Sequence, residues 1–161
     1  MNIDIIIIGA ILIAVCILPF VLMRQNRKKR EKQLFKSLSN IAEKQNCKIT
    51  QYECCIELAI GLDKTANYLF FFNRFKDKEI AKYVNLAEIQ NCKLVNTTRN
   101  INNKYGNYKV IDKLELKFSP IDKNKPYVFF EFYNAEEGLQ LTEERNLIEK
   151  WEKIITERLV S

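Results

Sequence analysis

The sequence predicts an α+β protein: an N-terminal transmembrane helix, then an antiparallel β-meander capped by a C-terminal amphipathic helix. Three observations lead to this fold class. An uncharged apolar run occupies residues 5–23. About six or seven strand-like segments then alternate with polar turns, and the chain ends in a helical period. The predicted divisions are a short extracytoplasmic N-terminus (1–4), the transmembrane helix (5–23), a basic juxtamembrane helix (24–46) and the domain (47–161).

The run at residues 5–23 contains no charged side chain. As a helix it would extend about 28 Å, which matches the hydrocarbon thickness of a bilayer. Its many β-branched residues would favour a strand in water, but in lipid a helix satisfies all of its own backbone groups. Pro19 lies near the end of the run, where a membrane helix tolerates a kink. We therefore expect one membrane-spanning helix.

The flanks of the run favour an anchor over a cleaved signal peptide. Signal peptides begin with positive charge and end at a small-residue cleavage site, whereas here Asp4 precedes the run and a basic cluster follows it. Basic residues remain on the cytoplasmic side of the membrane. We expect a single-pass protein of the bacterial inner membrane, with its N-terminus outside and its domain in the cytoplasm. The membrane-surface basic cluster comprises Arg24, Arg27, Lys28, Lys29, Arg30 and Lys32.

The net charge of +6 is concentrated in this part of the chain. Residues 24–36 carry a net +6, whereas residues 37–161 carry 19 basic and 18 acidic side chains. A nucleic-acid-binding face needs a basic stripe on the folded surface, so we expect no nucleic-acid partner. The cluster would attract anionic lipid headgroups near residues 24–36. Whether it does more than fix topology stays open.

The composition argues against catalysis, cofactors and metals. The chain has no histidine, which removes the usual triads and imidazole metal sites. Its four glycines form no phosphate-binding loop. The five cysteines contain no C-x-x-C pair, and the adjacent Cys54 and Cys55 would point to opposite faces of a strand. We expect free thiols in a reducing compartment and no enzymatic activity.

After the basic cluster, Leu34, Leu38, Ile41 and Ala42 form one helical stripe. We expect this stripe to pack against the domain that follows. A coiled-coil dimer seam is the alternative, but fewer than two heptads are present.

Residues beyond 48 change to a period of two. The first strand, residues 56–62, should bury one face. Turns are expected at residues 63–67 and 119–126, a polar connection at 73–79 and a loop or hairpin tip at 100–107. The further predicted strands are residues 68–72, 80–86, 89–97, 113–118 and 127–133.

The C-terminal helix should begin at Thr142, a suitable N-cap residue that precedes two glutamates. Its wide apolar stripe must be buried against the sheet. We expect Trp151 to fill this core and not to stack on a ligand. The stripe comprises Leu147, Ile148, Trp151, Ile154, Ile155 and Leu159.

Residues 84–95 place an apolar–acidic–Ile step before a strand, and residues 60–63 and 69–71 form an apolar hairpin. Together with the C-terminal helix and its central Trp, this pattern resembles the pleckstrin-homology-like domains of bacterial membrane-anchored proteins over residues 47–160. Lipid-binding members carry a basic first loop, but residues 63–67 offer only Lys64 beside Asp63. The resemblance therefore implies the barrel and not headgroup recognition.

The expected function is a membrane-anchored protein-interaction or scaffold module that binds a membrane-protein partner. An anionic-lipid-sensing domain at the inner leaflet is the alternative, and homo-oligomerisation through residues 34–45 is a third. A groove lined by Tyr52, Phe75 or Tyr105 would favour peptide or ligand binding.

Overall fold

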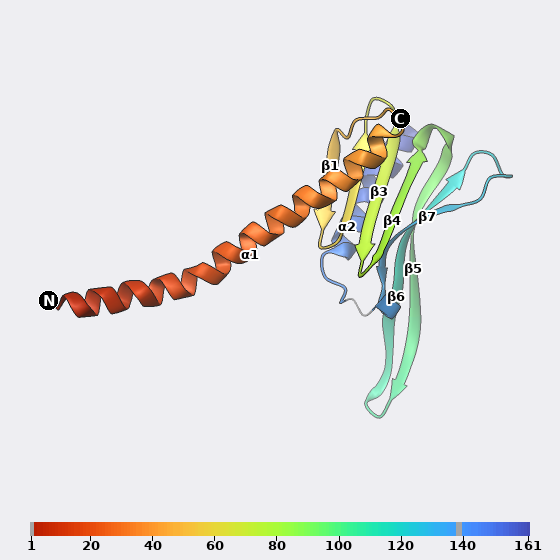
Figure 1. The fold of residues 1–161 in the computed structure, drawn as a ribbon. Coiled ribbons are helices and arrows are strands. Elements are labelled where there is room, and N and C mark those ends of the chain that lie inside the picture. The colour runs from red at the N-terminus through yellow and green to blue at the C-terminus, as the bar shows by residue number, and fades with distance from the viewer. Residues whose placement is uncertain (1, 138–139) are drawn as a thin grey trace.

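A computed structural model describes residues 2–137 and 140–161 of the chain. A long N-terminal helix leads into two antiparallel sheets, and a second helix ends the chain (Figure 1). The helices are α1 (Ile3–Glu43) and α2 (Glu144–Val160). The first sheet has the order β1-β2-β3-β4, with β1 (Gln51–Cys55), β2 (Leu58–Asp63), β3 (Tyr68–Phe75) and β4 (Lys78–Asn85). The second has the order β5-β6-β7, with β5 (Ile89–Asn103), β6 (Gly106–Pro120) and β7 (Val128–Asn134).

The predicted α+β class is confirmed, but the sheets do not close into the predicted barrel. Within the described residues β4 does not pair with β5, and β1 does not pair with β7. The short 3-10 helix η1 (Leu86–Glu88) separates β4 from β5, and the side chain of Asn85 caps it by accepting a hydrogen bond from the amide of Ala87. This corner takes the chain from the first sheet into the second, so that the two sheets pack over a shared core.

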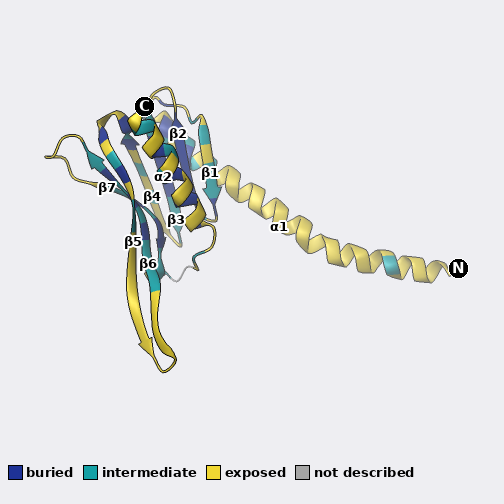
Figure 2. Ribbon diagram, turned by 180° about the vertical axis from the view of Figure 1, so that it is seen from behind, coloured by how far each residue is buried: buried dark blue, intermediate teal, exposed yellow. Residues whose placement is uncertain are grey.

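α1 is one unbroken helix that joins the apolar run to the folded body. Its apolar N-terminal half is exposed and is long and apolar enough to cross a membrane (Figure 2). Pro19 lies inside the helix without ending it. The helix ends at Glu43, three residues before the predicted Asn46, because Asn46 adopts a left-handed φ of 55° that terminates the helical path.

The C-terminal part of α1 packs on the outer face of the first sheet. Leu34, Leu38 and Ala42 are buried there, as the stripe predicted. They contact a group from β2 and β3 that comprises Ala59, Phe70 and Phe72. Every residue of β2 is therefore buried, so the prediction that this strand buries one face is wrong. The stripe is used within the chain and is not left free as a dimer seam.

The main core lies between the two sheets and α2. Trp151 is completely buried in it, which confirms its predicted role. Thr142 does not cap α2, contrary to prediction, since the N-cap is Glu143 and makes no side-chain cap bond. The hydroxyl and amide of Thr142 instead donate to the carboxylate of Glu144 at 3.0 and 2.8 Å, which satisfies this nearly buried acid.

The structure shifts several strand boundaries. The strand predicted at residues 56–62 is β2, which begins at Leu58, whereas Ile56 occupies the β1–β2 turn. The sequence does not predict β1, because this short segment mixes polar and apolar residues. Of the predicted connection at residues 73–79, only residues 76 and 77 form a turn, with Lys76 at φ 52°, because β3 continues to Phe75 and β4 begins at Lys78. Residues 100–107, predicted as a loop or hairpin tip, form a hairpin tip of two residues, and the rest of the segment is strand.

The outer half of the β5–β6 hairpin projects beyond the two sheets (Figures 1 and 2). A register shift between Thr97 and Thr98 separates it from the packed half. We call residues 98–111 the arm. Every arm residue from 98 to 109 is exposed. At its tip Gly106 has φ 128°, a conformation that side-chain-bearing residues rarely adopt.

Candidate functional site at the junction of helix and domain

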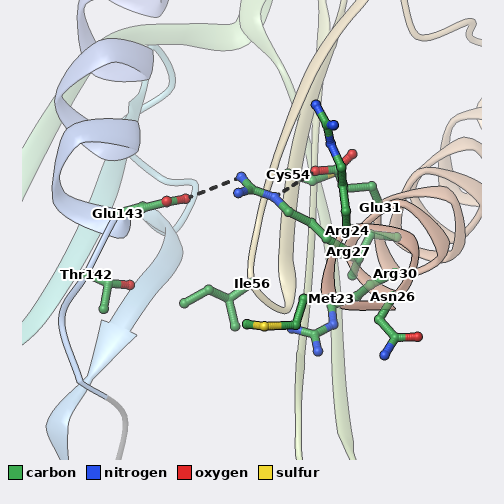
Figure 3. Close-up of a pocket in the computed structure, with 11 residues that line it drawn as sticks. Met23, Arg24, Asn26, Arg27, Arg30, Glu31, Cys54, Ile56, Thr142 and Glu143 are labelled. Carbon is green, nitrogen blue, oxygen red and sulfur yellow. Dashed lines mark hydrogen bonds and ion pairs between the residues drawn. The ribbon is translucent and has the colours of Figure 1, made fainter. Parts of the chain in front are cut away.

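A hollow of about 690 Å³ lies where α1 first meets the domain (Figure 3). Three elements form its walls: the α1 segment that follows the apolar run, the β1–β2 turn, and the loop that precedes α2. Its lining residues are Met23, Arg24, Asn26, Arg27, Arg30, Glu31, Leu34, Cys54, Ile56, Thr142 and Glu143.

The period of α1 divides the predicted basic cluster into two groups. Arg24, Arg27 and Arg30 follow one another at three-residue intervals and share the helix face that carries Leu34 into the domain. All three line the hollow. The remaining members, Lys28, Lys29 and Lys32, do not line it, although they too are exposed.

Two of these arginines connect α1 to carboxylates. Arg27 reaches Glu31 on its own helix at 3.3 Å and Glu143, ahead of α2, at 3.8 Å (Figure 3). Arg30 lies 3.5 Å from Glu57 in the β1–β2 turn. Such exposed pairs each contribute at most about 1 kcal/mol, so they orient the helix more than they stabilise the fold.

Arg24 differs from its neighbours on this face. Among the residues that the structure describes, no carboxylate lies within 4.0 Å of its guanidinium. It follows Met23 directly, and Met23 ends the apolar run. The free cation therefore lies at the point where the chain would leave a bilayer.

The hollow also has an apolar side. Met23 is 70% exposed, and Ile56 of the β1–β2 turn is 41% exposed. Ile56 has φ 49°, in the left-handed region that β-branched residues avoid because of steric strain. A strained, half-exposed isoleucine beside three arginines gives the hollow an amphipathic lining.

Cys54 lines the hollow, but its chemistry does not suit nucleophilic catalysis. Burial raises the pKa of the thiol to about 11, and the charges of Glu31 and Glu53 add to this effect. A protonated thiol is a weak nucleophile and metal ligand. No group of three or more metal-binding side chains occurs in the part of the chain that the structure describes. The arrangement suits recognition of an anion.

The three aromatics that could have lined a groove lie apart. Tyr52 packs on Phe35 of α1 with ring centroids 4.3 Å apart, Phe75 ends β3 beneath the ammonium of Lys76, and Tyr105 lies at the tip of the arm. None of them lines the hollow. Sequence reasoning found its arginines but missed Ile56 and Glu143, which only the fold brings to α1.

Comparison of the chain with protein-family models, with curated proteins and with solved structures gave no match.

Proposed function

We propose that this protein is a single-pass, membrane-anchored interaction module that presents the arm to the acidic surface of a partner protein. The observation that carries this proposal is the arm itself, a 14-residue extension of the hairpin in which residues 98–109 are all exposed and only Ile111, at its base, packs against the main core. An isolated two-stranded ribbon is only marginally stable in water. A partner that packs on the arm would supply the contacts it lacks.

The anchor part of the proposal rests on α1. Its apolar segment finds no cover within the domain, and the helix continues without a break into side chains that the domain buries. A rigid helix of this kind holds the domain at a set distance from the bilayer. The basic cluster after the apolar segment supports the orientation with the N-terminus outside and the domain in the cytoplasm.

One face of the arm carries an apolar strip. Ile101 pairs with Tyr108, and Arg99 pairs with Val110. Residues directly opposite in an antiparallel pair share a face, as do residues two apart on one strand. Ile101 and Tyr108 are 38% and 48% exposed. Ile101, Tyr108 and Val110 form this strip, and we assign it as the surface that contacts the partner.

The positive charge of the arm indicates that the partner surface is acidic. The arm contains three cations and no acidic residue. Arg99 pairs at 3.3 Å with Asp112, just outside the arm, whereas Lys104 and Lys109 have no carboxylate within 4.0 Å in the described part of the chain. An acidic partner surface would complement these lysines and accelerate association. Confinement of both proteins to one membrane raises their effective concentration.

A photo-crosslinking residue placed at Tyr108 in the full-length, membrane-embedded protein tests this function. We expect one discrete protein adduct, and we expect the charge reversals Lys104→Glu and Lys109→Glu to abolish it. The matched control position is Tyr83 on β4, which is 47% exposed and lies outside the arm. Equal adducts at both positions, or an adduct that survives charge reversal, would contradict the proposal.

The order of elements also supports a proposed place among pleckstrin-homology-like domains. Four antiparallel strands, then three, then a helix with a central Trp agree with the resemblance seen in residues 47–160. Such domains serve many functions, so the fold alone assigns none. Anionic-lipid recognition, the second candidate, is favoured by a different feature, the hollow beside α1.

A further inference from the structure

We propose that the hollow between α1, the β1–β2 turn and the loop before α2 binds the phosphate headgroup of one anionic phospholipid. Arg24 and Arg27 would hold the phosphate, while Met23 and Ile56 would contact the glycerol and the first acyl carbons. This inference depends on the anchoring of α1 in a membrane and is independent of the arm and its partner.

The place of the hollow in the chain favours a lipid over a free phosphate. Met23 ends the apolar run, and Arg24 and Arg27 follow within one helical turn. If residues 5–23 span the hydrocarbon, these guanidiniums lie at the depth of the headgroups. A phosphate there belongs to a molecule that also has an apolar part, and the hollow has an apolar side to receive it.

The distribution of charge leaves room for a phosphate. Glu31 and Glu143 both direct a carboxylate oxygen to Arg27, and Glu57, which pairs with Arg30, also accepts a 3.0 Å bond from Arg74. Arg24 has no such partner in the described residues. A guanidinium presents paired N–H donors that match two phosphate oxygens. Arg24 is thus the primary ligand, and Arg27 is the second.

The conformation of Ile56 provides independent support. Asn or Gly would occupy a turn position with φ 49° at less cost than a β-branched residue. The side chain is 41% exposed and does not belong to either buried core cluster of the described chain. Contact with an amphipathic ligand would explain an isoleucine at this strained, open position.

If the hollow binds a lipid, the effect of removing a cation should depend on where that cation lies and not on the total charge of the cluster. Arg24 lines the hollow and Lys28 does not, although both are exposed cations one helical turn apart. If lipids associate only through the diffuse attraction of the basic cluster, the loss of either charge should have the same effect. If the hollow is a built site, only the loss of Arg24 should matter.

Native mass spectrometry of the full-length, detergent-solubilised protein distinguishes these cases. The protein would be titrated with dioleoyl phosphatidylglycerol and, separately, with dioleoyl phosphatidylcholine. We expect one phosphatidylglycerol to be retained, and we expect Arg24→Gln to weaken its retention about fivefold or more, with Lys28→Gln close to wild type. Equal losses in both variants, or equal retention of the two lipids, would overturn the proposal.

Two further measurements complete the test. The first distinguishes a lipid site from a site for soluble phosphates, and the second distinguishes an effect on lipid binding from an effect on stability. Glycerol phosphate in large excess should not displace the retained lipid; displacement would indicate a site for soluble phosphates. Ile56→Asn should raise the midpoint of thermal unfolding, because Asn tolerates the left-handed turn, and yet should lower lipid retention. Unchanged retention in this better-folded variant would refute the role of Ile56. Alkaline carbonate extraction checks the anchor separately.

Discussion

The indole Nε1–H of Trp151 donates a 2.9 Å hydrogen bond to the Oε2 atom of Glu53, which joins α2 to β1 across 98 residues of sequence. The other carboxylate oxygen of Glu53 lies 2.7 Å from the ammonium of Lys150, the preceding residue of α2. β1 is an edge strand that pairs only with β2 in the described sheets. One carboxylate therefore links this edge strand to the C-terminal helix and satisfies the polar atom of the largest core residue.

Glu53→Ala should destabilise the fold by about 1–3 kcal/mol, because it leaves a buried indole N–H without an acceptor. Trp151 is the only tryptophan in the chain, so its fluorescence reports directly on this environment during urea unfolding in detergent micelles. The control is Glu149→Ala, which removes an exposed pair with Arg145 and should change stability by less than about 0.5 kcal/mol. Equal losses would show that the bond to Trp151 contributes nothing specific.

Asp63 should make the stability of the domain depend on pH. Burial alone would raise its pKa, but backbone amides of Ala66, Lys48 and Thr65 and the charge of Arg158 outweigh burial and lower it. A carboxyl with a lowered folded pKa stabilises the protein fully above its unfolded pKa, near 4, and this stabilisation is lost as pH falls through the folded value. Stability should therefore decline below about pH 4 in part through Asp63.

Asp63→Asn tests this contribution. An amide cannot accept all of the three backbone hydrogen bonds, of 2.8–2.9 Å, that the carboxylate accepts. We expect a loss of about 1–3 kcal/mol at neutral pH, which should narrow as both proteins are acidified below about pH 4. Chemical unfolding at a series of pH values measures the difference. A gap that stays constant with pH would argue that the loss is steric.

Gly61 sets how closely α1 approaches the first sheet. A Cβ atom built there would lie 2.7 Å from Cδ2 of Leu38 and 3.1 Å from two carbons of Ile49. Gly61→Val should destabilise the fold by about 1–3 kcal/mol through overpacking. Leu38→Ala should itself be destabilising through a cavity, but the double variant should be more stable than the sum of the two losses predicts. Strict additivity in thermal unfolding would mean that the two residues do not share this contact.

Much of the fold could be predicted because the spacing of apolar residues along the chain indicates which side chains are buried. The stripe of Leu34 and Leu38 and the stripe around Trp151 both predict packing faces, and both faces are buried in the structure. Strand β2 shows the limit of predictions from hydrophobic spacing. Its period of two predicts one buried face, but the small residues Ala59 and Gly61 admit α1 on the other side. Alternation alone does not show that a helix will cover the second face.

The arm and the hollow exceed what local sequence can predict, for different reasons. Asn-rich residues 100–107 suggest a loop, but strand pairing in the arm depends on backbone hydrogen bonds that any of these side chains permit. The hollow combines α1 with Ile56 and Glu143, which lie far away along the chain. The sequence singles out the arginines as part of a basic cluster, whereas the division between the arginines that line the hollow and the lysines that do not required the position of the domain.

The arm should be the least stable part of the second sheet in the free protein. Its residues 98–109 are all exposed, whereas Cys92 and Leu116 in the packed half of the same hairpin are almost fully buried. Local opening of a segment costs little when few buried contacts are lost. In hydrogen–deuterium exchange we expect the amides of residues 99–109 to exchange well before those of residues 91–95 of the same strand pair.

Binding of the proposed acidic partner should reverse this order locally. A partner that packs on Ile101 and Tyr108 would bind only the arm whose two strands are paired. Binding should therefore protect the amides of the arm from exchange, while those of the packed half stay unchanged. The charge-reversed variants at Lys104 and Lys109 provide the matched control, because their arms should remain in fast exchange when membranes that contain the partner are present. Slow exchange of the arm in the purified protein would instead show that the ribbon is stable alone, which would remove the main physical reason to assign it a partner.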